Sequence, residues 1–308
     1  MAVPKQLVGY GFLFMHFAIL IFANFVLSSV CIIFAFKFDF IMLKFISFGS
    51  GSSGNSYLLL ADDDALVIDS GVGVRSLKKY YHDFGIKLSD IHSIIITHDH
   101  ADHVKSVGAV SNEWDIPVYA TEAVHEGIRR NYCVRKKIGA SNVRYIKKDD
   151  TYQIGSFKVT PFDVPHDSND NVGYRIERNG VVFCLMTDVG HVTDKIKENV
   201  SLADYLVIEA NHDEAMLAGG PYPQHLKVRV AGDRGHMSNR VCAETIAACA
   251  SDRLKHVWLC HLSEENNHPV LLAKTMENVL GNCGEKVGRN FKLDILKRKT
   301  PTGFFTLE

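Results

Sequence analysis

The chain has 308 residues, enough for one large domain or two small ones, and its 46% hydrophobic and 22% charged content is that of a globular protein with a sizeable core. Its formal net charge is −1, so net charge alone does not indicate a nucleic-acid binder. Its seven cysteines are odd in number and form no Cys-x-x-Cys pair, which indicates buried thiols in a reducing compartment and not a disulfide framework.

The first 41 residues differ from the rest of the chain. Residues 7–36 contain no Lys, Arg, Asp or Glu, and a membrane span needs about twenty such residues. One interpretation is a transmembrane anchor. Lys5 before the segment and Lys37 and Lys44 after it then favour a cytoplasmic C-terminal domain tethered to the inner membrane. The other interpretation is an over-called translation start, because a plausible first strand begins at Met42. The sequence leaves both open.

From Met42 onward, short apolar strands alternate with helical stretches. We expect strands at residues 43–48, 56–60, 65–68, 93–96, 118–120, 157–163, 172–177, 181–186, 205–208, 256–259 and 291–296. We expect helices at residues 75–84, 102–114, 122–129, 192–199, 239–250 and 269–282. Two strand-rich halves with interspersed helices indicate two sheets packed face to face with helices outside. No repeat or Pro/Gly linker interrupts residues 42–308, so we expect a single domain there.

One cluster of ligand-type residues stands out at the end of an expected strand. Directly after the apolar run 94–96 the chain reads Thr97-His98-Asp99-His100-Ala101-Asp102-His103. Such a cluster at the mouth of a buried strand is costly unless it is compensated, and imidazole nitrogen with carboxylate oxygen suits zinc and similar divalent ions. On an extended stretch His98 and His100 project to the same side. A helix that starts near Ala101 would move the last two ligands to a neighbouring position, so one segment can serve two adjacent metal ions.

The pattern His-x-His-x-Asp-His after an apolar strand resembles the signature of the metallo-β-lactamase-fold hydrolases. The resemblance implies an α+β fold, a four-layer αββα sandwich in which two facing mixed sheets are flanked by helices. It implies that residues 42–308 are a hydrolase domain of this type, preceded by the apolar segment 1–41. It also implies two divalent metal ions, with Zn²⁺ favoured by the ligand types and Mn²⁺ as an alternative.

Three further ligand-type residues each follow a mostly apolar run: His166, Asp188 and His261. By the resemblance, one metal ion would be held by His98, His100 and His166. The second would be held by Asp102, His103 and His261, and Asp188 would bridge the two. A metal-bridging hydroxide would then attack phosphorus or a carbonyl carbon. Asp69, which ends another apolar run, matches an early Asp of the family that we expect to orient a metal ligand by a hydrogen bond.

Two segments between Asp188 and His261 resemble the transfer-RNA 3′-processing nucleases, in which a Glu pairs with the His of a Gly-His-Ser segment. The matching residues here are Glu209 and His236. A leaving oxygen on a phosphodiester needs a proton, and a His beside a carboxylate is a suitable general acid. We therefore expect the catalytic residues to be Asp102, Glu209 and His236.

Two observations keep alternatives open. His236 could instead be structural, because it lies beside a natural helix N-cap at Ser238 or Asn239. Asn211-His212 stands where the transfer-RNA nucleases have Thr, and their tRNA-gripping arm is not evident, which argues against tRNA as the substrate.

The loop Gly49-Ser50-Gly51-Ser52-Ser53-Gly54-Asn55-Ser56 narrows the resemblance, because small residues let backbone N–H groups approach a phosphate or a metal site. Together with residues 211–213, 235–239 and 261–267, it resembles the YycJ/WalJ group of bacterial metal-dependent nucleases. That resemblance implies a 5′-to-3′ DNA exonuclease. A run with five Lys or Arg residues between Arg129 and Lys137 supports nucleic acid modestly, although a solvated loop explains it equally well.

Other functions remain in competition with this one. They are a small-molecule phosphodiesterase, a tRNA-type RNA-processing nuclease and, from another class, a membrane-linked signalling accessory protein. The accessory protein should lack a metal ligand, and none is missing here. The sequence leaves the oligomeric state open and gives a membrane partner only if residues 7–36 are an anchor.

Overall fold

The computed structural model describes residues 43–61, 64–282 and 291–308. The apolar segment 7–36 lies outside the described residues, and so do both interpretations of it. Within the described ranges, every helix is too short or too polar to cross a membrane.

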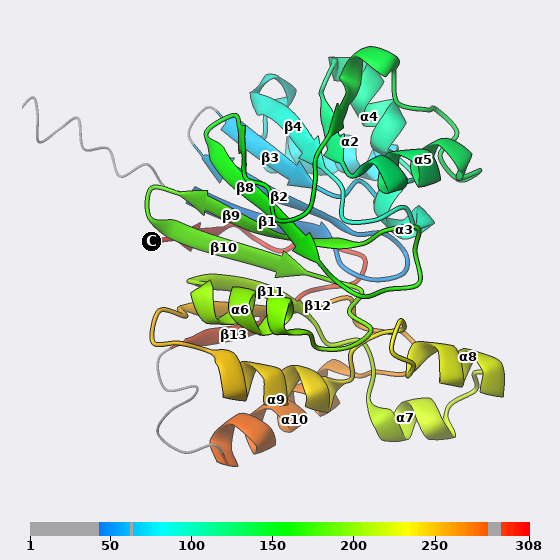
Figure 1. The fold of residues 1–308 in the computed structure, drawn as a ribbon, viewed down its shortest axis with the longest axis vertical. Coiled ribbons are helices and arrows are strands. Elements are labelled where there is room, and N and C mark those ends of the chain that lie inside the picture. Colours follow the sequence, from blue (N-terminus) through cyan, green and yellow to red (C-terminus); the bar gives the residue numbers. More distant parts are fainter. Residues whose placement is uncertain (1–42, 62–63, 283–290) are drawn as a thin grey trace, which may run out of the picture. The chain divides into compact units, whose positions relative to one another are not determined.

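Two mixed sheets of seven strands each form the centre of the protein (Figure 1). The first sheet has the strand order β14 (Phe305–Leu307), β1 (Leu43–Gly49), β2 (Ser56–Ala61), β3 (Asp64–Ile68), β4 (Ile91–Ile95), β5 (Val118–Ala120) and β6 (Val143–Tyr145). The second has the order β13 (Lys292–Ile295), β12 (His256–Cys260), β11 (Tyr205–Glu209), β10 (Val181–Met186), β9 (Val172–Arg178), β8 (Phe157–Asp163) and β7 (Tyr152–Ile154). In each sheet, one half is antiparallel and the other is parallel.

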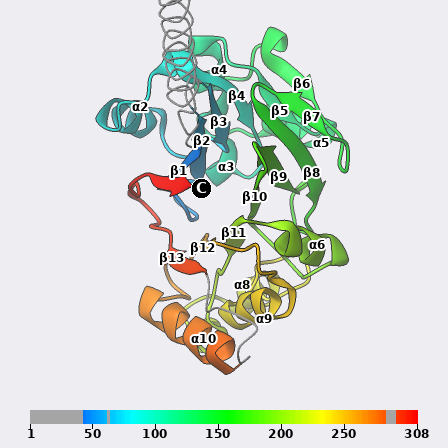
Figure 2. The same cartoon turned by 90° about the vertical axis from the view of Figure 1, so that its left-hand side faces the viewer.

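Helices cover the outer face of each sheet, so the expected four-layer α+β sandwich is confirmed. Against the first sheet lie α2 (Val74–Asp83), α3 (Ala101–Val104), α4 (Val107–Trp114) and α5 (Glu122–Arg130). Against the second lie α6 (Asp194–Leu202), α9 (Asn239–Cys249) and α10 (Pro269–Asn282). Figure 2 shows the two groups of helices on opposite sides of the sheets. The connection from β11 to α9 carries two short helices, α7 (Glu214–Gly219) and α8 (Gln224–Val230), and two 3₁₀ turns lie at Leu88–Asp90 and Ala140–Asn142.

The alternation of side chains along each strand divides the core into layers. Between the sheets, Phe45 from β1 packs against Phe183 and Trp258 from the second sheet, with ring centroids 5.2 and 4.7 Å apart. The neighbouring Ile46 points the other way and belongs to the cluster under α2 and α4. Because a one-residue slip would exchange these faces, the apolar pattern fixes the register of β1.

The carboxyl ends of the parallel strands meet at one edge of the sandwich, and this edge positions the site. Ligands in open α/β sheets bind outside the carboxyl ends of the strands, because polar side chains in the following loops converge there. The strands β3, β4, β8, β10, β11 and β12 all end at this edge, and each is followed by or ends in a candidate site residue.

The sequence predicts one helix over residues 102–114, whereas the structure has two, α3 and α4. The backbone explains the break. The carbonyl oxygen of Asp102 accepts a hydrogen bond from Asn55 N at 2.7 Å, and Ser106 N donates to Ser70 O at 2.9 Å. These two groups would have bonded each other in a continuous helix, so two nearby loops divert them.

Gly71 is the point of closest approach between these loops and the motif. A Cβ built on Gly71 would lie 1.5 Å from the carbonyl oxygen of Asp102, so an alanine requires the backbone to move. We expect Gly71→Ala to destabilise the fold by about 1–3 kcal/mol, as overpacking does. A lower midpoint of thermal or urea unfolding would measure this. Gly219→Ala is the matched control because a Cβ there meets nothing within 4 Å. Equal midpoints for both variants would contradict the prediction.

Candidate metal centre

The motif after β4 brings four ligand-type side chains to the sheet edge. His98 and His103 are buried, and His100 and Asp102 are half-buried. His100 is the residue before the first turn of α3, where its extended backbone ends the loop. The motif therefore supplies two ligand-type side chains from an extended stretch and two from a helix, as the sequence predicts.

Asp99 is the one His or Asp of the motif that lies outside the cluster. Its Oδ1 accepts a hydrogen bond from Asn169 N at 3.2 Å, and its Oδ2 accepts one from the Asn169 side chain at 2.5 Å. Asp99 thus holds the motif to the loop that follows β8, which carries His166.

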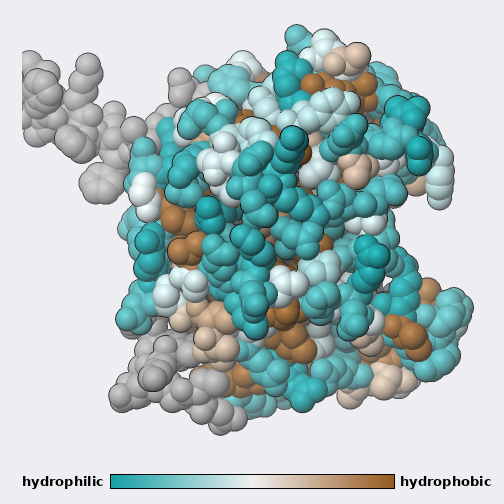
Figure 3. All heavy atoms as spheres, in the orientation of Figure 1, coloured by the Kyte–Doolittle hydropathy of each residue, from teal (hydrophilic) through white to brown (hydrophobic). Residues whose placement is uncertain are grey.

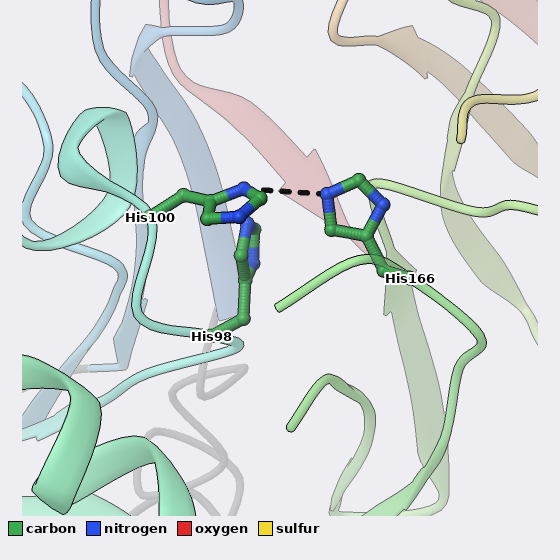
Figure 4. A group of neighbouring side chains, drawn as sticks. All are labelled: His98, His100 and His166. Carbon is green, nitrogen blue, oxygen red and sulfur yellow. Dashed lines mark hydrogen bonds between the residues drawn. The ribbon is translucent and has the colours of Figure 1, made fainter. Parts of the chain in front are cut away.

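Three imidazoles converge in a first group: His98, His100 and His166 (Figure 4). The Nδ1 atom of His100 lies 3.3 Å from Nε2 of His166. His166 Nδ1 lies 2.9 Å from the carbonyl oxygen of Gly235, so this nitrogen carries the proton and leaves the lone pair of Nε2 facing the group. His98 Nε2 is buried without a hydrogen-bond partner among the described residues. A buried, unpartnered nitrogen beside two other imidazoles fits a divalent cation.

The second group consists of Asp102, His103 and His261. Asp102 Oδ2 lies 3.4 Å from His261 Nε2 and 3.6 Å from His103 Nε2. Asp188 lies between the two groups, because its Oδ2 is 3.2 Å from His103 Nε2 and its Oδ1 is 3.7 Å from His166 Nε2. Asp188 Oδ1 also lies 3.5 Å from Nδ1 of His261, in the second group. The structure therefore brings all seven ligand-type residues expected from the sequence into one cluster.

The electrostatics of the cluster suit a bound cation. Burial disfavours a charged imidazole at His103, but the carboxylates of Asp188, Asp69 and Asp102 outweigh burial and raise the pKa of His103 to about 10. Burial, reinforced by the charge of His103, holds the pKa of His98 well below its ordinary value. The carboxylates thus stabilise positive charge at the centre of the cluster. The imidazole of His98 stays neutral, which is the form in which a histidine binds a metal.

Three residues of the site have left-handed backbone conformations within two residues of a strand end. The φ angles of Asp69, Asp188 and His261 are 60°, 56° and 53°. Such a conformation is uncommon for residues other than glycine, and sparsely populated backbone conformations cost roughly 1–3 kcal/mol each. At each position the chain turns sharply at the strand end, and the side chain faces the cluster.

Asp69 contacts His103 in the way that the resemblance implies. Its Oδ2 lies 2.7 Å from His103 Nδ1, and its Oδ1 accepts a hydrogen bond from Thr97 N at 2.8 Å. The carboxylate therefore holds the proton on Nδ1 and directs Nε2 into the cluster.

We expect Asp69→Asn to weaken metal binding by about 10–100-fold, since an amide cannot accept the same two hydrogen bonds and still orient the ring. Competition with a chelating dye measures the affinity. Asp64→Asn is a matched control: Asp64 lies on the same strand and its Oδ1 is 3.1 Å from Nδ1 of His92, outside the cluster. An unchanged affinity in Asp69→Asn would refute the orienting role.

Glu209 makes the contact expected from the sequence and a second one that sequence analysis missed. Its Oε1 lies 2.9 Å from Nδ1 of His236 and 2.9 Å from Nδ1 of His261. Its Oε2 accepts hydrogen bonds from the backbone N–H groups of Val189 and Met237, at 2.7 and 3.0 Å. Burial works against the charged form of this fully buried carboxyl, but His236 and His261 lower its pKa to about 2. Glu209 thus joins the expected proton donor to the metal cluster.

His236 lies at the border between the cluster and solvent, with 18% of its side chain exposed. Burial disfavours its charged form, but Glu209 and Asp188 outweigh burial and raise its pKa above the ordinary value. The N-cap of α9 is Ser238, whose Oγ accepts a hydrogen bond from Val241 N at 3.2 Å. The capping position is therefore filled without His236. With Asp188, Glu209 and His261, His236 also forms a group that could hold an ion itself.

Asparagines support the cluster at positions that the sequence did not single out as site residues. Asn55 Nδ2 lies 2.8 Å from His103 Nε2 and 3.1 Å from Asp102 Oδ2. Asn211 donates to the carbonyl oxygen of His261 at 2.9 Å, and Asn171 donates to that of Asp188 at 3.0 Å. Asn55 and Asn211 lie in segments that carry the family resemblance, which is the only sequence signal for them.

The Gly/Ser loop after β1 was expected to direct backbone N–H groups at a phosphate or a metal site, but in the structure some of these groups bond within the loop. Gly51 N donates to the Asn55 side chain at 2.8 Å, and Gly54 N donates to Gly51 O at 2.8 Å, so these N–H groups are used inside the loop. Ser50 Oγ accepts a hydrogen bond from His261 N at 2.9 Å. The loop therefore supports His261 and Asn55.

Comparisons with known proteins agree with the fold. Residues 65–262 match the model of the beta-lactamase superfamily domain. "Exodeoxyribonuclease YycJ" of Bacillus anthracis is 31% identical over 84% of this chain and 97% of its own. "Exodeoxyribonuclease WalJ" of Streptococcus pneumoniae is 33% identical over 81% of this chain and 93% of its own. The metallo-beta-lactamase fold protein YhfI of Bacillus subtilis superposes with a TM-score of 0.65 at 17% identity, covering 86% of this chain and all of that one.

Proposed function

The chain belongs to the beta-lactamase superfamily and to the group of the YycJ and WalJ exodeoxyribonucleases, and from this premise we propose that it is a 5′-to-3′ DNA exonuclease with two divalent metal ions. It is a metal-dependent hydrolase for phosphodiester bonds, and the finer assignment is our proposal. The observation that carries it is the convergence of seven imidazole and carboxylate ligands from four separate chain segments. Two relatives named exodeoxyribonucleases, each covering most of the chain, support DNA as the substrate.

We assign one ion to His98, His100 and His166, and the other to Asp102, His103 and His261. Asp188 would be shared by the two ions, because its carboxylate lies within 3.2–3.7 Å of His103, His166 and His261. When bound, divalent ions polarise a phosphoryl oxygen and lower the pKa of water, which supplies both the electrophile and the nucleophile of hydrolysis. Zn²⁺ suits these ligands best, and Mn²⁺ is the alternative.

The chain's own residues supply the proton for the leaving group. Glu209 lies 2.9 Å from Nδ1 of His236 and keeps a proton on that nitrogen. The second nitrogen, Nε2, is then free to donate its own proton to the leaving oxygen. The raised pKa of His236 favours the protonated form that a general acid needs. Asp102 keeps its charge next to His103 and His261, because these imidazoles outweigh burial and lower its pKa.

The experiment is the cleavage of double-stranded DNA labelled at either the 5′ or the 3′ end, with Mn²⁺ or Zn²⁺ added to chelator-treated protein. We expect early release of the 5′ label as a short product, about two ions bound per chain, and no cleavage after chelation. Early release of the 3′ label would show that the enzyme degrades DNA from the 3′ end, contrary to the proposed direction. Cleavage of RNA or of small cyclic phosphates in place of DNA would overturn the substrate. Protein that binds no metal would favour a non-catalytic accessory role.

A further inference from the structure

A second feature of the described surface lies beside the cluster, between α5 and the edge strand β6. It is a cavity of about 880 Å³. Its lining includes the apolar side chains of Ile128, Ile138 and Val143 and the exposed cations Arg129 and Lys147. A volume of this size is within the range of small-ligand pockets, roughly 300–1,000 Å³. The lining also contains three carboxylates, and two of these pair with its cations: Glu126 with Arg129, and Asp170 with Lys148. The apolar walls and the remaining cations, Lys137 and Lys147, fit a ligand that has flat apolar parts and negative charges.

The charge around this cavity contrasts with that of the whole chain. Residues 121–148 contain eight Lys or Arg and two Glu, whereas the chain has a net charge of −1. Part of this charge is neutralised, because Glu126 pairs with Arg129 and Arg130, and Lys148 pairs with two Asp side chains. The cations without a carboxylate partner among the described residues are Arg135, Lys136, Lys137, Arg144 and Lys147. Of these, Lys137 and Lys147 line the cavity. The segment keeps an excess of positive charge, which suits a polyanion.

Two tyrosines are exposed on the same segment. Tyr132 is 90% exposed and Tyr145, which lines the cavity, is 65% exposed. Figure 3 shows a largely hydrophilic face, hollowed at its edge between the part over α5 and the part over α8. Exposed aromatic rings among cations are the usual means of binding single-stranded nucleic acid, because the bases stack on the rings while the cations meet the phosphates. In a duplex the bases are already stacked and cannot use such rings.

The cavity has a neighbour that reaches one of the clustered histidines. Lys148 and Asp170 line it and also line a second cavity of about 300 Å³, whose wall includes His166. Thr121, at the start of α5, donates to Asp170 Oδ2 at 2.8 Å, which fixes this boundary. The two cavities are therefore neighbours, and the ion pair of Lys148 with Asp170 lies at their shared wall.

We propose that the cavity between α5 and β6 is a binding groove for a single-stranded segment of the nucleic-acid substrate, in which bases stack on Tyr145 and phosphates meet Lys147. The proposal rests on the proposed nuclease function and adds to it: the enzyme grips unpaired nucleotides outside the reaction centre. Binding there is separate from cleavage, so it can be measured without activity.

The test uses the full chain with Lys147→Glu, Tyr145→Ala and Tyr145→Phe, and with Lys274→Glu on α10 as the matched charge control. The affinity for a fluorescent single-stranded oligonucleotide is measured by anisotropy at several salt concentrations. We expect Lys147→Glu to weaken binding about tenfold. The slope of log affinity against log salt should become shallower by about 0.7 for each phosphate that the variant no longer neutralises. Tyr145→Ala should weaken binding at least about fivefold, and Tyr145→Phe should bind like wild type because the stacking ring remains.

Hydrolysis of bis(4-nitrophenyl) phosphate serves as the control for an intact reaction centre, and it should be unchanged in all four variants. Equal affinities for Lys147→Glu and wild type, or equal losses in Lys147→Glu and Lys274→Glu, would overturn the groove. Competition by blunt duplex or by polyglutamate as strong as that by single strands would overturn the single-strand assignment. If wild type binds the oligonucleotide in the groove but cleaves no phosphodiester, the proposed function fails and the groove stands.

Discussion

Replacing Asp188 with asparagine is expected to reduce DNA cleavage by roughly 10³-fold or more while the fold persists. The side chain is buried, and its oxygens lie within 3.2–3.7 Å of nitrogens of His103, His166, His236 and His261. Asparagine keeps the shape and tolerates the left-handed backbone at this position, where φ is 56°. It removes the negative charge that both proposed metal ions share, so both should bind weakly.

The measurement combines the metal content of the purified variant with its rate of cleavage of end-labelled DNA. Asp115→Asn is the matched control, because Asp115 also has a left-handed backbone, with φ of 54°, but is exposed at the end of α4. The control should retain metal, activity and the wild-type unfolding temperature. Asp188→Asn should still unfold cooperatively, at a lower temperature because it binds less metal. A fully active Asp188→Asn protein would remove Asp188 from the reaction centre and would contradict the proposed pair of ions.

The cluster could be predicted from the sequence because its ligands follow apolar runs. His166, Asp188 and His261 each come after a mostly apolar stretch, and the carboxyl ends of those strands meet at one edge of the sandwich. The local pattern marked these residues as candidates, and the resemblance to the family implied that they converge. The pattern did not predict the left-handed turns at Asp69, Asp188 and His261, because those turns depend on the loops packed around them.

Contacts between segments far apart in sequence were harder to predict. Glu209 lies 52 residues from His261, and only the parallel pairing of β11 with β12 brings the two together. Asn55 contacts His103 because its loop hydrogen-bonds to α3 at the carbonyl oxygen of Asp102. That bond, with the one from Ser106 N to Ser70 O, also breaks the expected helix over 102–114. Strands β6, β7 and β14 were missed; each has three residues, and of the three-residue strands only β5 was predicted among the described residues.

The second large effect is expected at His236, and it should depend on the leaving group. In His236→Gln, cleavage of DNA should fall by about 10²–10⁴-fold, the usual contribution of general acid–base catalysis. The 3′ or 5′ oxygen of a nucleotide is a basic leaving group that needs a proton. The 4-nitrophenolate of bis(4-nitrophenyl) phosphate is a weak base that leaves without a proton. The rate of hydrolysis of this substrate should therefore fall little in His236→Gln.

Glu209→Gln provides the contrast, because Glu209 contacts His261 as well as His236. Its loss should disturb both proton donation and a proposed metal ligand, so we expect slower cleavage of both substrates. Parallel rates on DNA and on the chromogenic ester, with metal content alongside, separate the two roles. If His236→Gln lost activity equally on both substrates and also lost metal, His236 would be a ligand in the group with Asp188, Glu209 and His261. Its solvent-facing position, with 18% of the side chain exposed, favours the proton donor, since a donor must reach an oxygen of the substrate.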